Sequence, residues 1–497
     1  MPSALILVID QGTTNTKALL VGGSGSPVFR ASAPVALLHS TLGHVEQDAQ
    51  QLWDSVRKVI AECVLHASKS GCLIEAVAIS NQRESAVAWN AETGSAIAHV
   101  ISWQCGRSAE ICRRLEPHAD AIRAKTGLPL ATLISAGKWA WLLENSAQAE
   151  ALAKAGALRL GTVDSWLIHR LTGGAVRATD LTNASRTGLL NLEQLAWDEE
   201  LLGLFGIPKS SMPEVRPSSG SFGFCTGIAG IEGVPILAAI GDSHAAMFGH
   251  GQYDAGAVKA TYGTGSSLMA LTSGLGADSP ILARTIAWSI ADKTQFALEG
   301  NIAMAGAAMQ WVGEFLQFAD PTKQAADLAA TVPDSGGVYF VPAMVGLGAP
   351  HWDATARGTI AGLGRSHTAA HLARAAVEAI AFQVADVFSA MEQGSGIVFP
   401  ALHADGGATR NSLLMQFQSD ILDRPVLRSA HEDLSAIGAS WLAGLALGWW
   451  SSLTEIANLP RATETFTPKM KSPDRDRRYS GWKLAVDRAR LKVQAHS

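Results

Sequence analysis

The chain has 497 residues, of which 47% are hydrophobic and 17% are charged. One hydrophobic core rarely organises so long a chain, and the composition excludes both a single small module and a disordered protein. The net charge is −5, without a long run of either sign. Nucleic acid and anionic membranes are therefore disfavoured as partners, because both require a clustered positive field.

The amino-terminal segment and the cysteines indicate a cytoplasmic protein. Five cysteines, never spaced as CxxC, make neither a disulfide framework nor a zinc knuckle. MPSALILVIDQG has an acidic residue inside its apolar run and no basic stretch before it, so we predict a first strand rather than a signal peptide. Leu434 to Thr454 is uncharged, but its Ser and Gly residues predict a core helix packed closely on a neighbour rather than a membrane span.

Strand-like and helix-like segments alternate along the whole chain, which predicts an α/β fold. In the first hundred residues we expect strands over LILVID, KALLV and EAVAIS, a helix over QQLWDSVRKVIAECVLHA and a turn at Asn90 to Gly94. Helices follow from Glu110 to Leu158, with a break at Gly127 to Pro129. An apolar strand from Val234 ends in GDSHAA, and we place the domain boundary there, giving domains 1–247 and 248–497.

The second half opens in the same order as the first. Lys259 to Leu271 has the strand, Gly/Thr turn and strand of Leu5 to Val21, which indicates an internal duplication. The last ~30 residues are basic and polar and predict a terminal helix with one solvated face. Further helices are predicted over Asn301 to Phe318, His371 to Met391 and Asn411 to Leu422, with a strand over ALHADGG.

Three turns each follow a strand and combine glycines with Thr or Ser hydroxyls: DQGTTNTK at Asp10 to Lys17, TYGTGSS at Thr261 to Ser267 and DGGATRN at Asp405 to Asn411. Glycines let the backbone approach an anion, amides and hydroxyls donate to phosphate oxygens, and a carboxylate can hold Mg²⁺. Each turn alone is more typical of an ordinary tight turn, and it is their joint occurrence that favours phosphate binding. Two of them facing each other would clamp the phosphates of a nucleotide. No GxxxxGK[ST] and no completed GxGxxG occurs, which disfavours P-loop enzymes and dinucleotide dehydrogenases.

Charged residues at strand ends form a second group of candidates. Arg83 and Glu84 follow the strand EAVAIS, where they can line a pocket or form a solvated ion pair. Asp242 follows an apolar strand, where a carboxylate is costly unless it binds something. Its position suits a base that accepts a hydroxyl proton during phosphoryl transfer. Trp103 can stack on a ligand or belong to the core.

Taken together, the motifs resemble those of the FGGY carbohydrate kinases, and within that family most closely the glycerol kinases. The resemblance implies two duplicated α/β domains of the actin, hexokinase and Hsp70 (ribonuclease H-like) type, with ATP in the cleft between them. It also implies direct in-line transfer of the γ-phosphoryl group of ATP to a hydroxyl, without a covalent intermediate. The matching segments, which span nearly the whole chain, include DQGTT at Asp10, NQRE at Asn81, TDLTNASRTGL at Thr179, YGTG at Tyr262, LEGNIAMAGAAMQW at Leu298 and DGGATRN at Asp405.

The resemblance assigns roles to individual residues. Asp10 is expected to hold Mg²⁺ through water, and Asp242 to act as the general base. Arg83, Glu84 and Trp103 are expected to hold the acceptor together with Asp242. The residues expected to bind ATP are Thr13, Thr14, Asn15, Lys17, Gly263, Thr264, Gly265, Gly306, Gln310, Gly407 and Asn411.

Three positions expected in the acceptor pocket depart from the glycerol kinase pattern, and Lys17 stands where the first turn of those enzymes continues to Arg. Leu133 stands where those enzymes have Tyr, Ser243 where they have Gln, and Ser267 where they have Phe. These differences predict a larger and more polar acceptor pocket, so we expect a small polyol or open-chain sugar larger than glycerol, with glycerol as the alternative. A non-catalytic sugar sensor and a nucleotide-switched ATPase are less favoured. Family members often form homodimers or homotetramers, and either is compatible with this sequence.

Overall fold

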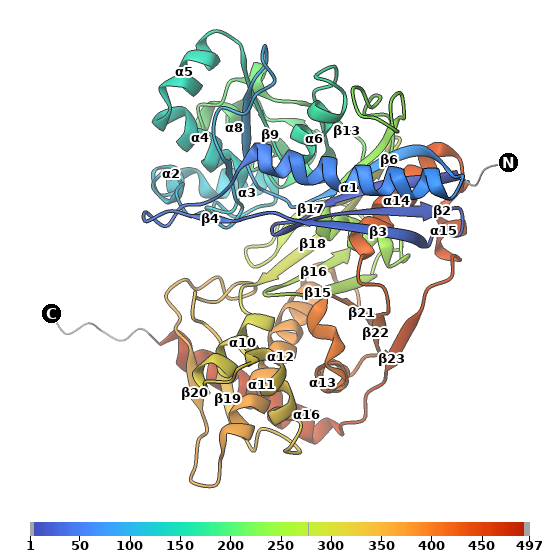
Figure 1. Cartoon of the computed structure of the whole chain (residues 1–497). Helices are drawn as coiled ribbons and strands as arrows, with labels where there is room; N and C mark the ends of the chain where they lie inside the picture. The colour runs from blue at the N-terminus through green and yellow to red at the C-terminus, as the bar shows by residue number, and fades with distance from the viewer. Residues whose placement is uncertain (1–3, 277, 492–497) are drawn as a thin grey trace.

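The computed structural model describes residues 4–276 and 278–491, which form two lobes, one above the other in Figure 1. Each lobe is built around one mixed β-sheet. The first sheet contains β1 (Ala4–Gln11), β2 (Asn15–Gly22), β3 (Pro27–Pro34), β6 (Leu73–Asn81) and β14 (Ile236–Gly241). The second contains β15 (Val258–Tyr262), β16 (Ser266–Leu271), β17 (Ala283–Ile290), β18 (Lys293–Ile302), β21 (Leu402–Asp405), β22 (Val426–Ser429) and β23 (Thr463–Phe466).

The two sheets share one topology. In the first, β2 is antiparallel to β1 and to β3, while β6 and then β14 continue the sheet in parallel. In the second, β16 is antiparallel to β15 and to β18, while β21 and then β22 continue it in parallel. Five strands of each sheet therefore correspond, which confirms the α/β fold and the predicted duplication.

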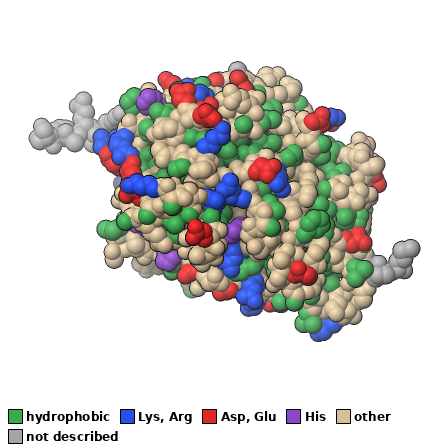
Figure 2. Space-filling model, turned by 90° about the horizontal axis from the view of Figure 1, so that it is seen from above, with side chains coloured by type: hydrophobic (Ala, Val, Ile, Leu, Met, Phe, Trp, Pro, Cys, Tyr) green, Lys and Arg blue, Asp and Glu red, His purple; other side chains and the backbone are tan. Residues whose placement is uncertain are grey.

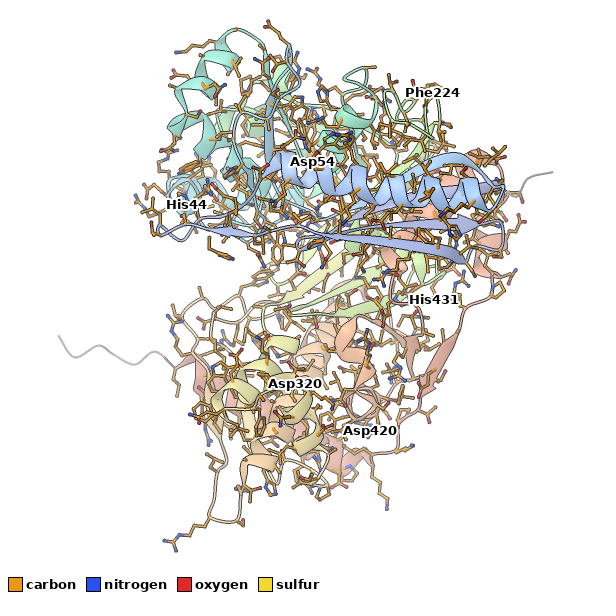
Figure 3. All side chains as sticks on the ribbon, viewed as in Figure 1. His44, Asp54, Phe224, Asp320, Asp420 and His431 are labelled. Carbon is orange, nitrogen blue, oxygen red and sulfur yellow. The ribbon has the colours of Figure 1, made fainter. Side chains whose placement is uncertain are left out.

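Helices cover both faces of the first sheet. Leu5, Leu7 and Ile9 of β1 pack in one core with α1 (Ala49–Lys69), while the alternate residues Ile6 and Val8 pack in another core with α14 (Leu434–Leu447). Because successive residues of a strand point to opposite faces, a strand covered on both sides needs an unbroken apolar run. The sequence LILVI meets that need. Figure 3 labels Asp54 on α1 in the upper lobe and Asp420 in the lower lobe.

Helix α14 belongs to the second half of the chain, yet it packs on the first sheet and on α9 (Asp242–Gly249). The crossing is close: a Cβ at Gly438 would lie 1.9 Å from the carbonyl oxygen of Ala245, and one at Gly249 would lie 2.6 Å from that of Leu434. The core helix predicted after Leu434 is thus confirmed. Within residues 4–276 and 278–491, none of the helices has the length and apolar character needed to cross a membrane.

The remaining elements agree with the sequence except at two element ends. The helical stretch predicted to reach Leu158 ends at Lys154, and Leu158 begins a strand that pairs with an earlier strand of the first half. Asn301 and Ile302 end β18, and the helix predicted from Asn301 begins only at Gly306. The residues of the strand pair with β16, and this ladder outweighs the local helical pattern. On the face that Figure 2 shows, basic and acidic side chains are interspersed.

The other elements of the first half are β4 (Leu38–His39), β5 (Val45–Gln47), β7 (Val87–Asn90), β8 (Val100–Ile101), α2 (Ala109–Leu115), η1 (Glu116–His118), α3 (Ala119–Thr126), α4 (Ser135–Asn145), α5 (Ala147–Lys154), β9 (Leu158–Gly161), α6 (Val163–Leu171), β10 (Ala178–Asp180), α7 (Leu181–Ser185), β11 (Leu190–Asn191), β12 (Ala196–Trp197), α8 (Glu199–Leu204), η2 (Lys209–Ser211) and β13 (Glu214–Arg216). Those of the second half are α10 (Gly306–Phe315), α11 (Pro321–Ala329), β19 (Tyr339–Val341), β20 (Thr359–Ala361), α12 (Ala369–Ser395), η3 (Gly407–Arg410), α13 (Ser412–Leu422), α15 (Leu453–Ala457) and α16 (Ser472–Arg490).

Candidate active site

Three parallel strands of the first sheet end at one edge and carry the acidic residues of the site. Asp10, near the end of β1, pairs in register with Ser80 of β6, and Gly241, at the end of β14, pairs with Asn81 of β6. Asp242 follows Gly241 directly as the first residue of α9. The topology therefore places both predicted aspartates at the same edge, on either side of β6.

Asp10 is buried, and its carboxylate is held by neutral donors. The Ser80 hydroxyl donates to Oδ1 at 2.8 Å, and the Ser435 hydroxyl of α14 donates to Oδ2 at 3.0 Å. Burial raises the pKa of Asp10, and Lys17 opposes that rise. Among the described residues, no Lys, Arg or His side chain forms an ion pair with Asp10. A bound metal ion would stabilise such a buried carboxylate, so Asp10 fits the predicted Mg²⁺ site.

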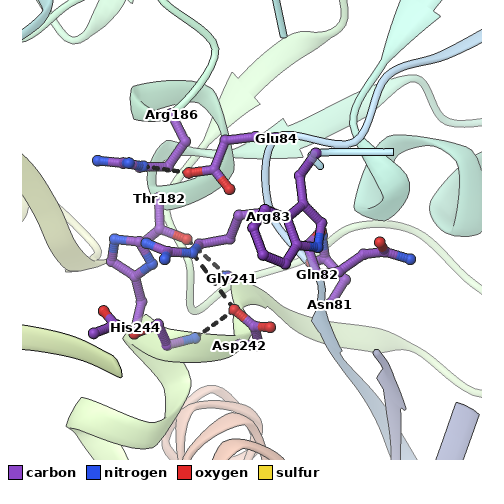
Figure 4. Close-up of polar contacts among 12 residues, drawn as sticks. Asn81, Gln82, Arg83, Glu84, Thr182, Arg186, Gly241, Asp242 and His244 are labelled. Carbon is purple, nitrogen blue, oxygen red and sulfur yellow. Dashed lines mark hydrogen bonds and ion pairs between the residues drawn. The ribbon is translucent and has the colours of Figure 1, made fainter. Parts of the chain in front are cut away.

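Asp242 is partly exposed at the start of α9. Its side chain is 41% exposed, but protein groups surround it, and Arg83 Nε lies 3.5 Å from its Oδ1 (Figure 4). The backbone N–H of Ser243 donates to the same oxygen at 2.6 Å. Removal from bulk water raises the pKa of Asp242 to about 6, with Asp10 adding to the rise and Arg83 opposing it. A carboxylate with this pKa is ionised at neutral pH and can accept a proton.

Behind Asp242, four buried charges alternate in sign. Arg83 Nη2 lies 2.8 Å from Glu299 Oε1, and Arg186 Nη1 lies 2.8 Å from Glu299 Oε2. Arg186 Nε donates to Glu84 Oε1 at 2.7 Å, the contact drawn at the top of Figure 4. Although burial acts in the opposite sense, Arg186 and Arg83 hold the pKa of Glu299 well below its usual range. The network fixes Arg83 and Glu84 in place and rules out the solvated ion pair that the sequence left open.

The local backbone explains how Arg83 and Glu84 reach this position. Glu84 has a left-handed backbone conformation with φ of 60°, which turns the chain sharply after β6 so that both side chains leave the strand end. A Cβ at Gly241 would lie 2.8 Å from Arg83 Cδ, so glycine is needed there for the arginine to pass. The backbone N–H of Gly241 donates to the Thr182 hydroxyl at 2.9 Å.

Trp103 is not a core residue. Its side chain is 36% exposed, and its indole N–H donates to the Thr13 hydroxyl at 2.9 Å. Thr13 belongs to the first glycine turn, where the N–H of Gly12 donates to the carbonyl of Asn15 at 2.9 Å. The structure thus joins a predicted acceptor residue to the first predicted phosphate turn.

The other residues of the first turn have different surroundings. Thr14 and Asn15 are exposed at its tip. Lys17 Nζ instead lies 2.8 Å from Asp433 Oδ1, just before α14, so its ammonium group is engaged in a contact between the two halves of the chain. The expected contact of Lys17 with phosphate stays a prediction.

The second glycine turn is seated on a helix start. The N–H of Gly306 donates to the carbonyl of Gly263 at 2.9 Å, and the N–H of Ala305 donates to that of Thr264 at 2.9 Å. A Cβ at Gly306 would lie 2.6 Å from the Gly263 oxygen, and one at Gly265 would lie 2.5 Å from the Ile302 oxygen. Gly263 and Thr264 are exposed at the amino-terminal end of α10, whose dipole favours an anion.

The third glycine turn lies beside the second. Thr261 of β15 pairs with Asp405 of β21, and a Cβ at Gly406 would lie 2.5 Å from the Tyr262 oxygen. Gly407 is exposed and faces open space. Asn411 caps α13, since its side-chain oxygen accepts from two backbone N–H groups. Gln310 is exposed on α10, where it donates to Glu314.

The three positions that depart from the glycerol kinase pattern do not all lie together. The Ser243 and Ser267 hydroxyl oxygens are 3.2 Å apart, although the residues belong to α9 and β16. Leu133 is half-buried in the loop before α4, where Lys138 Nζ donates to its carbonyl at 2.5 Å. The first two form a single small polar wall beside Asp242.

Sequence reasoning assigned no role to several residues of the site, namely Glu299, Arg186, Lys259, Ser80 and Ser435. A charged residue in an apolar segment indicates that it has a partner of opposite charge. The sequence does not show which residue that is when the two are far apart in the chain, as Arg186 and Glu84 are. Arg186 and Glu299 both lie inside segments that resemble family motifs, which was the one available signal.

With this geometry in view, comparison with known proteins identifies the family. The model of the FGGY family of carbohydrate kinases, N-terminal domain, matches residues 5–249, and that of the C-terminal domain matches residues 258–447. The chain belongs to this family. It is a carbohydrate kinase, which transfers a phosphoryl group from ATP to a hydroxyl of a polyol or sugar.

Full-length relatives carry different names. The chain is 44% identical to a glycerol kinase of Symbiobacterium thermophilum over 493 residues, covering 99% of each chain, and 44% identical to an apulose kinase of Pectobacterium atrosepticum over 503 residues, covering 100% of each. The crystal structure of Plasmodium falciparum glycerol kinase with ADP has a TM-score of 0.93 at 31% identity and covers 99% of each chain.

Proposed function

We propose that this kinase phosphorylates a polyol or open-chain sugar of four or five carbons rather than glycerol. Overall similarity does not decide the acceptor, since a glycerol kinase and an apulose kinase are equally identical to the chain. The observation that supports a larger acceptor is the polar wall of Ser243 and Ser267, whose hydroxyl oxygens lie 3.2 Å apart next to Asp242. Two short side chains there leave room that Gln and Phe would fill.

The acceptor would be held by the members of the charged network that lie next to Asp242, above all Arg83. Arg83 is 9% exposed, and its Nη1 has no hydrogen-bond partner among the described residues. An unpaired buried donor is costly, so an oxygen of the acceptor is the partner that this group lacks. Glu84 and Trp103 would complete the set of groups that hold the acceptor, and Leu133, in the loop before α4, is a further candidate.

Asp242 accepts the proton of the attacking hydroxyl. Its raised pKa, about 6, leaves it ionised at neutral pH, and Arg83 at 3.5 Å orients it. As the hydroxyl oxygen bonds to the γ-phosphorus of ATP and the bond to the leaving ADP oxygen breaks, the proton passes to the carboxylate.

The halves 1–247 and 248–497 would each contribute to ATP. The first turn would bring Thr13, Thr14 and Asn15 with Lys17, and Asp10 would hold Mg²⁺, which would supply charge neutralisation when bound. The second half would hold the rest of the nucleotide through Gly263, Thr264, Gly265, Gly306, Gln310, Gly407 and Asn411.

An acceptor screen tests this proposal. ADP release would be measured with glycerol, tetritols, pentitols, ketoses and apulose, and we expect one of the larger acceptors to have a kcat/KM at least about tenfold above that of glycerol. A double variant, Leu133→Tyr with Ser267→Phe, should shift the preference back toward glycerol by shrinking the pocket. A wild-type preference for glycerol over every larger acceptor would contradict the enlarged pocket and favour the glycerol kinase alternative.

A further inference from the structure

A chain of four hydrogen-bonded groups runs behind the polar wall. Lys259 Nζ donates to the Ser243 hydroxyl at 2.7 Å, the Ser243 and Ser267 hydroxyls share a bond of 3.2 Å, and Ser267 donates to Glu299 Oε1 at 3.0 Å. Lys259 and Glu299 are both completely buried. The chain therefore has a cationic donor at one end and a carboxylate at the other.

These two ends fix the direction of every bond between them. Glu299 is held ionised by two arginines and can only accept, so the single hydroxyl hydrogen of Ser267 points to it. Ser243 must then be the donor in the bond between the serines. Lys259 donates to Ser243 and also to the Thr261 hydroxyl at 2.8 Å, and these two bonds are available even to an uncharged amine.

The direction determines what the wall can offer to a ligand. Each serine hydroxyl has one hydrogen and two acceptor lone pairs. In this arrangement both hydrogens are used within the protein, and one lone pair on each oxygen is also used. Ser267, which is partly exposed, keeps one free lone pair and no free hydrogen, and Ser243 is nearly buried.

The guanidinium group of Arg83 lies close to this wall, because its Nη2 and the Ser267 hydroxyl both bind Glu299 Oε1. Arg83 Nη1 is a donor that lacks a partner among the described residues, and it belongs to the same guanidinium group that binds Glu299. A donor without a partner close to a free acceptor suits hydroxyl groups, because a hydroxyl can both accept and donate. A carbonyl oxygen placed next to Ser267 would find no hydrogen-bond donor there, because the hydroxyl hydrogen of Ser267 is already donated to Glu299.

We propose that Ser267, supported by Ser243, accepts a hydrogen bond from a hydroxyl of the acceptor that glycerol lacks, and that Lys259 and Glu299 are positioning residues that fix this polarity. The inference rests on the proposed function and deepens it. It selects acceptors that present a hydroxyl, rather than a carbonyl or a methyl group, to Ser267.

Threitol supplies a direct test because its two ends are identical. Its 1-deoxy analogue replaces one terminal hydroxyl by hydrogen, and its 1-deoxy-1-fluoro analogue replaces it by fluorine, which cannot donate. We expect kcat/KM for ADP release to fall about tenfold for both analogues relative to threitol, the scale of one lost hydrogen bond. A fluoro analogue turned over as fast as threitol would overturn the proposal.

Variants separate a direct contact from a general loss of activity. In Ser267→Ala the difference between threitol and 1-deoxythreitol should shrink to within about twofold, whereas the conservative Ser267→Thr should keep it. Ser289→Ala is the matched control: Ser289 lies in β17 of the same sheet, outside the three glycine turns, and its variant should keep the full difference. A tenfold difference that persists in Ser267→Ala would also overturn the proposal. If no acceptor, glycerol included, supports ADP release, the proposed function itself fails.

Discussion

Arg83 Nη2 lies 2.8 Å from Glu299 Oε1, and this buried ion pair joins the end of the first sheet to the second sheet. Arg83 follows β6, while Glu299 lies within β18 and pairs in register with Met269 of β16. The position of the residues predicted to hold the acceptor is therefore set from both lobes. Under the proposed function, Glu299 would act through its ion pairs with Arg83 and Arg186.

Glu299→Gln tests this coupling. The substitution keeps the shape but leaves two buried arginines short of an anion, and breaking a buried pair in this way costs about 3–5 kcal/mol. We expect urea denaturation to show that loss in the free energy of unfolding, together with a raised KM for the acceptor and a nearly unchanged KM for ATP.

The control for Glu299→Gln is Glu110→Gln, because Glu110 forms an exposed helical ion pair with Arg113. Exposed pairs contribute about 0–1 kcal/mol, so this variant should unfold almost as the wild type does. Equal stability of the two variants would show that the buried network does not hold the lobes as described.

The pH dependence of catalysis should report Asp242. Its pKa is raised to about 6 by removal from water, and the base must be ionised to accept a proton. As pH falls through about 6, protonation of Asp242 should reduce kcat/KM for the acceptor about tenfold per pH unit, while above that pH the profile should level off. Steady-state assays between pH 4.5 and 8, conditions chosen to bracket this pKa, check the position of the acid limb. An acid limb centred near pH 4 would mean that Asp242 titrates like an ordinary carboxyl.

Gly306→Ala should weaken ATP binding selectively. The added Cβ would lie 2.6 Å from the Gly263 carbonyl oxygen, which belongs to backbone and must move, so the second glycine turn shifts away from the phosphates. We expect the KM for ATP to rise about tenfold, the equivalent of ~1.4 kcal/mol, with the KM for the acceptor little changed. Gly203→Ala is the control, because no atom lies within 4 Å of a Cβ at that position of α8. If both variants bind ATP equally well, the turn has no part in the nucleotide site.

The sequence was sufficient for the local features of the fold and for choosing candidate site residues. Glycine turns after strands identified Asp10 and Thr264, because both the backbone freedom and the hydroxyls are encoded within a few residues. Contacts between distant segments were not accessible in this way. Nothing near Lys17 predicts its ion pair with Asp433, 416 residues later, and nothing near Ser267 predicts its bond to Glu299 in another strand.

The most direct test of the account is the turnover of Asp242→Asn. The amide keeps the size of the carboxylate and its place beside Arg83 but cannot accept the hydroxyl proton. We predict that kcat with the best acceptor of the screen falls by at least about a thousandfold, within the usual contribution of a general base, while the affinity for ATP measured by calorimetry stays within about twofold and the melting temperature is not lowered. A variant that keeps a tenth of the wild-type kcat would contradict the role of Asp242 as the base.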